Sequence, residues 1–166
     1  MVAAQARAMA AYNRWMNERI YDICAGIPDD ERKRERNAFF HSIHGTLNHL
    51  LLGDKIWLGR FEGIPYPVDS LDQELFTDFN DLWTERRTTD QRIEEWAAGL
   101  SDKELSGQFG FTSIVNPALH ECELWVAVTH FFNHQTHHRG QLTTLLSQSG
   151  HEYGTTDLIW LPGLMS

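Results

Sequence analysis

The chain has 166 residues, of which 42% are hydrophobic and 22% are charged, a composition typical of one globular domain with an ordinary core. Its formal net charge of −9 argues against a nucleic acid or an anionic membrane as partner, because both attract basic surfaces. The sequence shows no secretory signal and no apolar run near the roughly 20 residues that span a membrane. We therefore expect a single cytoplasmic domain over residues 1–166.

The first predicted helix runs from about Ala3 to Ala25, where apolar residues recur at helical spacing. It ends before a Gly-Ile-Pro sequence at residues 26–28. The basic residues between Arg32 and Arg36 that follow are interleaved with acidic ones, a pattern typical of a solvated charged segment.

The second predicted helix runs from about Phe40 to Glu62 and is apolar nearly all round, which indicates deep burial. A sequence rich in glycine and proline ends it at residues 63–67. Asp54 falls in the main apolar stripe of this helix. A buried carboxylate requires a partner, so we expect an arginine or a polar group of the first helix beside it.

A third, more polar helix is predicted from about Asp72 to Gly99, and a non-helical stretch follows it to about Ala118. The alternation over residues 107–112 is typical of a short strand, and residues 113–116 would turn it into a small β-hairpin. The last helix is predicted from about His120 to Ser149, before Gly150. Four such helices indicate an all-α four-helix bundle.

Two features remain outside these elements. The tail, Asp157-Leu-Ile-Trp-Leu-Pro-Gly163, is apolar, so we expect it to pack on the bundle or to form part of a dimer contact. Cys24 and Cys122 are far apart in helix-like contexts, and we interpret them as two reduced thiols.

Histidine is concentrated in the last helix, where four of the chain's nine histidines lie between His130 and His138. Histidines four residues apart lie above one another on a helix face and can share a metal ion. Random placement gives about 0.5 such pairs, whereas this helix has two, His130/His134 and His134/His138.

Helical phase separates these histidines. His138 falls within the apolar stripe of the helix and His134 at its edge, whereas His130 lies further off and His137 faces the surface. Gln141 falls beside the inward pair. The alternative is a pair of core histidines satisfied by hydrogen bonds, but each buried imidazole left unpaired costs about 1–3 kcal/mol.

A metal site needs at least a third ligand, and spacing alone does not choose it. The candidates are His41, His44, His49, His120 and carboxylates such as Asp54. Phase on the second helix places both His44 and His49 off its main stripe, but that helix is apolar nearly all round, so phase does not exclude either.

The sequence resembles the DinB family, a group of metalloenzyme-like proteins of the DinB/YfiT type named for DNA-damage induction. The resemblance covers nearly the whole chain in family order. It is carried by Tyr12-Asn-Arg-Trp15-Met-Asn17, by residues 42–58 with Asn48-His49-Leu50, by His134-x-x-x-His138-x-Gly-Gln141, and by Thr156-Asp157-Leu-Ile-Trp-Leu-Pro162.

The resemblance implies a four-helix bundle with one non-standard crossover and one divalent ion, nickel or zinc, held by His49, His134 and His138. It also implies a homodimer. Activities known among relatives are thiol-dependent isomerisation and S-transfer, with a low-molecular-weight thiol as co-substrate.

Two functions follow from these observations. In the first, the chain is an enzyme whose three-histidine ion activates a thiol or a water against a small-molecule substrate, as a thiol-dependent transferase, an isomerase or a hydrolase-like catalyst. Trp15, Asn17, Gln141 and His130 would then line or support the pocket, although Trp15 also suits an ordinary core position. In the second, the chain is a non-enzymatic stress-response module in which the ion joins two helices. A scaffold with satisfied histidines is a third, weaker interpretation.

Overall fold

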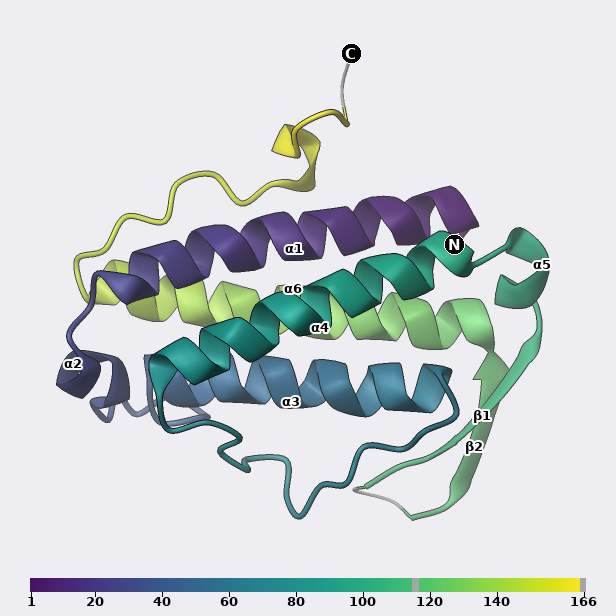
Figure 1. The fold of residues 1–166 in the computed structure, drawn as a ribbon, viewed down its shortest axis with the longest axis horizontal. Helices are drawn as coiled ribbons and strands as arrows, with labels where there is room; N and C mark the ends of the chain where they lie inside the picture. Colours follow the sequence, from purple (N-terminus) through teal and green to yellow (C-terminus); the bar gives the residue numbers. More distant parts are fainter. Residues whose placement is uncertain (115–116, 165–166) are drawn as a thin grey trace.

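Four long helices form a bundle in the computed structural model, which describes residues 1–114 and 117–164 (Figure 1). They are α1 (Ala3–Ala25), α3 (Ile43–Phe61), α4 (Phe79–Gly99) and α6 (Leu124–Gln148). Both α1 and α3 pack against α4 and α6, so that α1 and α3 lie diagonally in the bundle and the chain crosses it between them. The predicted all-α four-helix bundle is confirmed. No described helix is both long and apolar enough to cross a membrane.

The shorter elements lie at the ends of the bundle, except for the last, which lies on the tail alongside α1 (Figure 1). They are α2 (Asp29–Lys33), α5 (Asp102–Leu105), β1 (Gln108–Thr112), β2 (Leu119–Glu123) and a 3-10 turn, η1 (Leu158–Trp160). The two strands pair antiparallel, with Gln108 opposite Glu123, which confirms the predicted hairpin. Of the turn predicted at residues 113–116, Val115 and Asn116 lie outside the described residues.

Helix α4 begins at Phe79, seven residues later than the predicted start at Asp72. Asp78 is its N-cap, and its carboxylate accepts hydrogen bonds from the backbone amides two and three residues further on, at 2.8 and 3.1 Å. The preceding residues are held elsewhere, because the amide of Leu75 donates to the Oδ1 of Asn48 on α3 at 2.9 Å. The segment before Asp78 is therefore an irregular connection that covers α3.

Helix α6 begins at Leu124 rather than at the predicted His120. Residues 120–123 belong to β2, and the Leu124 amide donates to the Gly107 carbonyl at 2.9 Å, so the hairpin leads directly into the helix. The sequence of residues 120–123 continues the helical pattern of α6, but these residues pair with β1 instead.

The charged segment after α1 is only partly solvated, and the prediction was wrong for Arg32. Its side chain is buried, donates to the carbonyls of Cys24 (2.9 Å) and Ile27, and lies over the ring of Phe79 at 4.3 Å. The last carbonyls of a helix have no partner within it, and Arg32 is a donor to one of these in α1, that of Cys24.

The interior of the bundle is layered. One apolar cluster includes Ile20, Leu47, Leu51, Leu82 and Leu146, and a second, toward the hairpin, includes Ala6, Leu58, Ile93 and Phe131. Between them every long helix contributes buried polar side chains: Asn13, Asn17, Asp54, Arg86, Asp90, Gln135 and Arg139. We call these seven residues the polar layer.

The tail folds back along α1, as Figure 1 shows. Arg19 donates to the Thr155 carbonyl at 2.8 Å, and the Tyr12 hydroxyl donates to the Thr156 carbonyl. Beyond these contacts, Ile159 and Trp160 keep 51% and 60% of their surface exposed. Cys24 and Cys122 are both free, the first buried and the second half-buried.

Candidate metal centre

Three imidazole rings meet between α3 and α6. His49 comes from α3, and His134 and His138 come from successive turns of α6. Each offers one ring nitrogen to a set whose members all lie within 4.8 Å of one another. This group could hold a metal ion, since three neutral imidazoles are a common donor set for divalent zinc or nickel.

The polar layer fixes the phase of α6 behind the two histidines. Gln135 and Arg139 each follow one of them in sequence, so the two pairs lie on adjacent faces of the helix. The Gln135 amide donates to Asp54 at 2.8 Å, and Arg139 donates to Asn13. These buried contacts turn His134 and His138 toward α3.

Helix α3 accommodates His134 only because residue 53 is a glycine. A Cβ atom built at Gly53 would lie 2.7 Å from Cε1 of His134, closer than real Cβ contacts come. Sequence reasoning missed this position. A glycine inside a buried helix, one turn after His49, is the signal that marks such a close approach.

Hydrogen bonds on the outer side of two rings determine where their protons lie. Nδ1 of His49 donates to the Leu71 carbonyl at 2.9 Å, and Nδ1 of His138 donates to Oε1 of Gln141 at 2.8 Å. In the neutral rings both Nε2 atoms are then unprotonated, and they lie 3.2 Å apart. Two lone pairs that face each other repel, so this arrangement suits a cation shared between them.

His134 completes the set of three rings. Its Nδ1 is buried and has no hydrogen-bond partner among the described residues. Burial, with the neighbouring histidines, lowers the pKa of His134 to about 3, and burial lowers the pKa of His49 to about 4. Burial also lowers the pKa of His138. All three rings are therefore neutral near pH 7, the protonation state that binds a metal.

One side of the cluster is closed by an aromatic ring. Phe40, which precedes α3, stacks on His49 with ring centroids 3.7 Å apart and planes 16° apart. The same ring meets His138 edge-on at 5.3 Å. These contacts limit the rotation of both imidazoles and keep solvent from that side.

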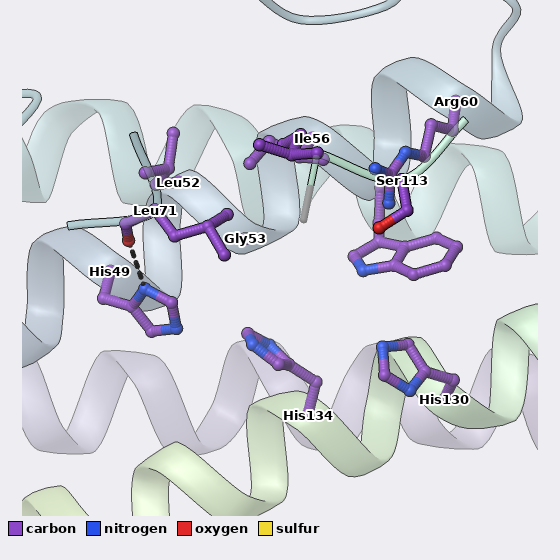
Figure 2. A pocket seen from close by; sticks show the side chains of 11 residues that line it. His49, Leu52, Gly53, Ile56, Arg60, Leu71, Ser113, His130 and His134 are labelled. Atoms are coloured by element: carbon purple, nitrogen blue, oxygen red, sulfur yellow. Dashed lines mark hydrogen bonds between the residues drawn. The ribbon is translucent and has the colours of Figure 1, made fainter. Parts of the chain in front are cut away.

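The opposite side opens into a cavity of about 300 Å³ (Figure 2). His49 and His134 line it, and His130 and Arg60 lie at its far end. Trp57 packs against both of these side chains. The walls between them are mostly apolar, from Leu52, Gly53, Ile56, Leu71 and Ile114. A small organic molecule in this cavity would reach two of the three imidazoles.

Of the four other predicted site residues, two lie beside the three histidines and two lie elsewhere. Gln141 binds His138, as given above, and His130 lines the cavity with its ring centroid 6.1 Å from that of His134. Asn17 belongs to the polar layer and donates to Asp90 at 2.9 Å. Trp15 packs against Tyr12. Neither Asn17 nor Trp15 lines the cavity or makes a hydrogen bond or ring contact with the three histidines in the described part of the chain.

The other candidate ligands are engaged elsewhere. Nε2 of His44 donates to the Phe76 carbonyl at 2.8 Å, His41 is exposed beside Glu35, and His120 stacks on Phe111 in the hairpin. Asp54 forms a buried ion pair with Arg86 at 2.6 Å. The expectation that an arginine or a polar group of the first helix lies beside Asp54 is therefore confirmed by Arg86.

Comparison with known proteins shows which proteins the chain resembles over most of its length. A model of the DinB family matches residues 1–164. The Bacillus subtilis (strain 168) protein called Protein DinB is 26% identical over an alignment of 157 residues, which covers 88% of this chain and 87% of that protein. A crystal structure of a DinB-like protein from Bacillus cereus has a TM-score of 0.59 at 18% identity, over 84% of this chain and 89% of that one. The fold and the chain-wide sequence likeness point to the same group of proteins.

Proposed function

This chain belongs to the DinB family, and from that premise we propose that it is a metal-dependent enzyme in which His49, His134 and His138 hold one divalent ion, nickel or zinc. The observation that carries the proposal is the 3.2 Å approach of two Nε2 atoms whose rings both donate through Nδ1. A cation is the partner that makes this approach favourable.

The reaction that suits the site is attack by a low-molecular-weight thiol, or by water, on a small electrophile. When bound, the ion supplies a Lewis acid that lowers the pKa of the thiol or the water. Three protein ligands without a fourth among the described residues are typical of catalytic rather than structural sites. The substrate enters through the cavity beside His49 and His134.

The chain's own residues prepare the site for this chemistry. Leu71 and Gln141 hold the rings of His49 and His138 in one orientation, and the apolar walls exclude water. Burial and the charge of Arg60 lower the pKa of His130, so its ring is neutral near pH 7 and can accept a proton in the cavity.

The test is elemental analysis of protein purified without an affinity tag or added metal. We expect one divalent ion per chain, lost in His134→Ala and retained in His137→Ala, because His137 is exposed on the same helix. We further expect turnover of an aryl halide by thiols that stops on chelation. Protein without stoichiometric metal would overturn the proposal.

A structural role is the second candidate, because the three rings join α3 to α6 at the edge of the polar layer. Bound metal would then add directly to folding stability. Chelation separates the two functions. A large fall in Tm, with no metal-dependent turnover of thiols, electrophiles or esters, would favour the structural role.

A further inference from the structure

Arg60 is the one permanently charged side chain among the described residues that line the cavity. It lies on α3 eleven residues after His49, which is about three helical turns, so both side chains belong to the same face of the helix. Figure 2 shows His49 at one end of the cavity, Arg60 and His130 at the other, and His134 between them. The cavity therefore runs from the imidazole cluster to a guanidinium group.

This guanidinium has no carboxylate partner within ion-pair distance in the described part of the chain. Its hydrogen bond goes to the Thr112 carbonyl at 3.0 Å, and its central carbon lies 4.6 Å from the ring centre of Trp57 and 5.2 Å from that of Phe111. By contrast, Arg14 and Arg92 each pair with a glutamate at 2.6–2.8 Å. Arg60 is thus held in place by a carbonyl and two aromatic faces, and Glu121, which lines a neighbouring cavity with it, lies beyond ion-pair distance.

The surroundings of Arg60 also reduce its contact with water. Burial lowers the pKa of its side chain, which nevertheless remains a cation at any physiological pH. A second cavity of about 450 Å³ shares Trp57, Arg60, Ser113 and His130 with the first. A partly desolvated cation at the junction of two cavities attracts an anion more strongly than an exposed one does.

We propose that Arg60 binds a carboxylate of the small molecule whose reactive end meets the three-histidine cluster, an inference that rests on the proposed function. The backbone positions of His49 and Arg60 are about 16 Å apart along the helix axis, so the molecule is extended, with its carboxylate remote from the reacting atom. A single guanidinium matches a monoanionic carboxylate, which it can bind through two parallel hydrogen bonds.

The walls between the two ends specify the rest of the molecule. Leu52, Ile56 and Leu71 offer only apolar surface, so the middle of the ligand is an aliphatic or aromatic spacer. The ligand class is therefore an amphipathic acid that carries a thiol or an electrophilic centre at the end away from its carboxylate.

The test compares mercaptohexanoate with mercaptohexanol, which differ only at the end that would meet Arg60. Binding to cobalt-loaded protein is followed by the thiolate-to-cobalt absorption band. We expect the carboxylate to bind about tenfold or more tightly in the unmodified protein. Arg60→Gln should abolish this preference, and Arg60→Lys, which keeps the charge, should retain part of it.

Arg87→Gln is the matched control, because Arg87 also lies over a tryptophan, Trp83 at 4.1 Å, but on α4 away from the cavity. It should leave the preference unchanged. Equal affinity for the two thiols in the unmodified protein, or a preference that survives in Arg60→Gln, would overturn the inference.

A metal-free arm separates this inference from the proposed function. Calorimetric titration of the metal-free protein with octanoate and with octanol should show the same dependence on Arg60. If no metal binds but octanoate is preferred, the metal proposal fails and Arg60 retains its role. If thiols reach the cobalt but the carboxylate has no effect, only the role of Arg60 is lost.

Discussion

At the scale of single residues, the site depends on how closely two helices approach. His134 lies across α3 at the point where Gly53 has no side chain, and His49 and His138 face each other through unprotonated nitrogens. Phase on α6 predicted that His134 and His138 point inward. Phase could not select His49, because α3 is buried on nearly every side and offers no polar face for contrast.

Gly53→Ala tests the importance of this close approach. The new methyl group would meet the His134 ring at 2.7 Å and displace it, so we expect metal affinity to fall about tenfold or more. Gly140→Ala is the control, because a Cβ there meets nothing within 4 Å. This control should bind metal normally and gain about 0.5–1 kcal/mol of stability from reduced backbone freedom. Metal titration and urea denaturation measure both effects, and equal metal affinity in the two variants would contradict the prediction.

The histidines also make the metal-free protein sensitive to acid. In the unfolded chain a histidine protonates near pH 6.5, whereas in the folded chain the pKa of His49 is about 4 and that of His134 about 3. The unfolded state therefore binds more protons below pH 6.5, so the free energy of unfolding falls as the pH falls and is insensitive to these rings above it. We expect a loss of at most about 2 kcal/mol per ring at pH 5 relative to pH 7.

Urea denaturation of the metal-free protein at a series of pH values measures this loss. In His134→Ala the dependence on pH should be shallower, because one of the two strongly shifted groups is gone. A variant with the same slope as the unmodified protein would show that His134 does not carry the effect.

At the scale of the elements, α6 has two functions on adjacent faces. His134 and His138 face α3, while Gln135 and Arg139 enter the polar layer, so one rotation of α6 about its axis places both pairs correctly.

Sequence periodicity predicted the long helices well, with the bounds of α1 reproduced. It failed where tertiary contacts decide the structure: the start of α4, where an asparagine of α3 holds the preceding segment, and the start of α6, where strand pairing prevails.

The polar layer should be a large contributor to stability. In Asp54→Ala the buried cation of Arg86 loses one of its two carboxylate partners, and Gln135 loses its acceptor. We expect a loss of about 3–5 kcal/mol, typical of a broken buried ion pair. Glu62→Ala is the matched control, since it removes the exposed pair with Arg92 and should cost at most about 1 kcal/mol. Urea denaturation compares the two variants, and similar losses would contradict a dominant role for the polar layer.

At the scale of the whole molecule, two apolar clusters lie on either side of the polar layer, and the imidazole cluster lies at the layer's edge. The site thus lies beside buried polar side chains that come from all four long helices. Composition predicted a globular domain, and periodicity predicted four long helices and hence a bundle. The diagonal placement of α1 and α3 follows from contacts between residues far apart in sequence, which periodicity does not encode.

We propose that the chain forms a homodimer and that the tail contributes to the contact. Ile159 and Trp160 are held out on the tail with more than half of their surface exposed, which is costly for a monomer. Trp160→Ser should shift the protein from dimer to monomer in sedimentation velocity. Ile64→Ser, at an isoleucine with 73% exposure outside the tail, should leave the dimer intact. A monomeric unmodified protein at all concentrations would refute the proposal.

The Leu71 carbonyl couples the conformation of the irregular connection between α3 and α4 to the orientation of His49. This connection, residues 63–78, orients His49 through that carbonyl and lines the cavity with the Leu71 side chain. Any ion that favours one orientation of His49 also favours one path of the connection, by reciprocal linkage. If the site binds an ion as proposed, we expect a protease that cuts within residues 63–78 to report on metal loading, because chains without the ion would be degraded more readily.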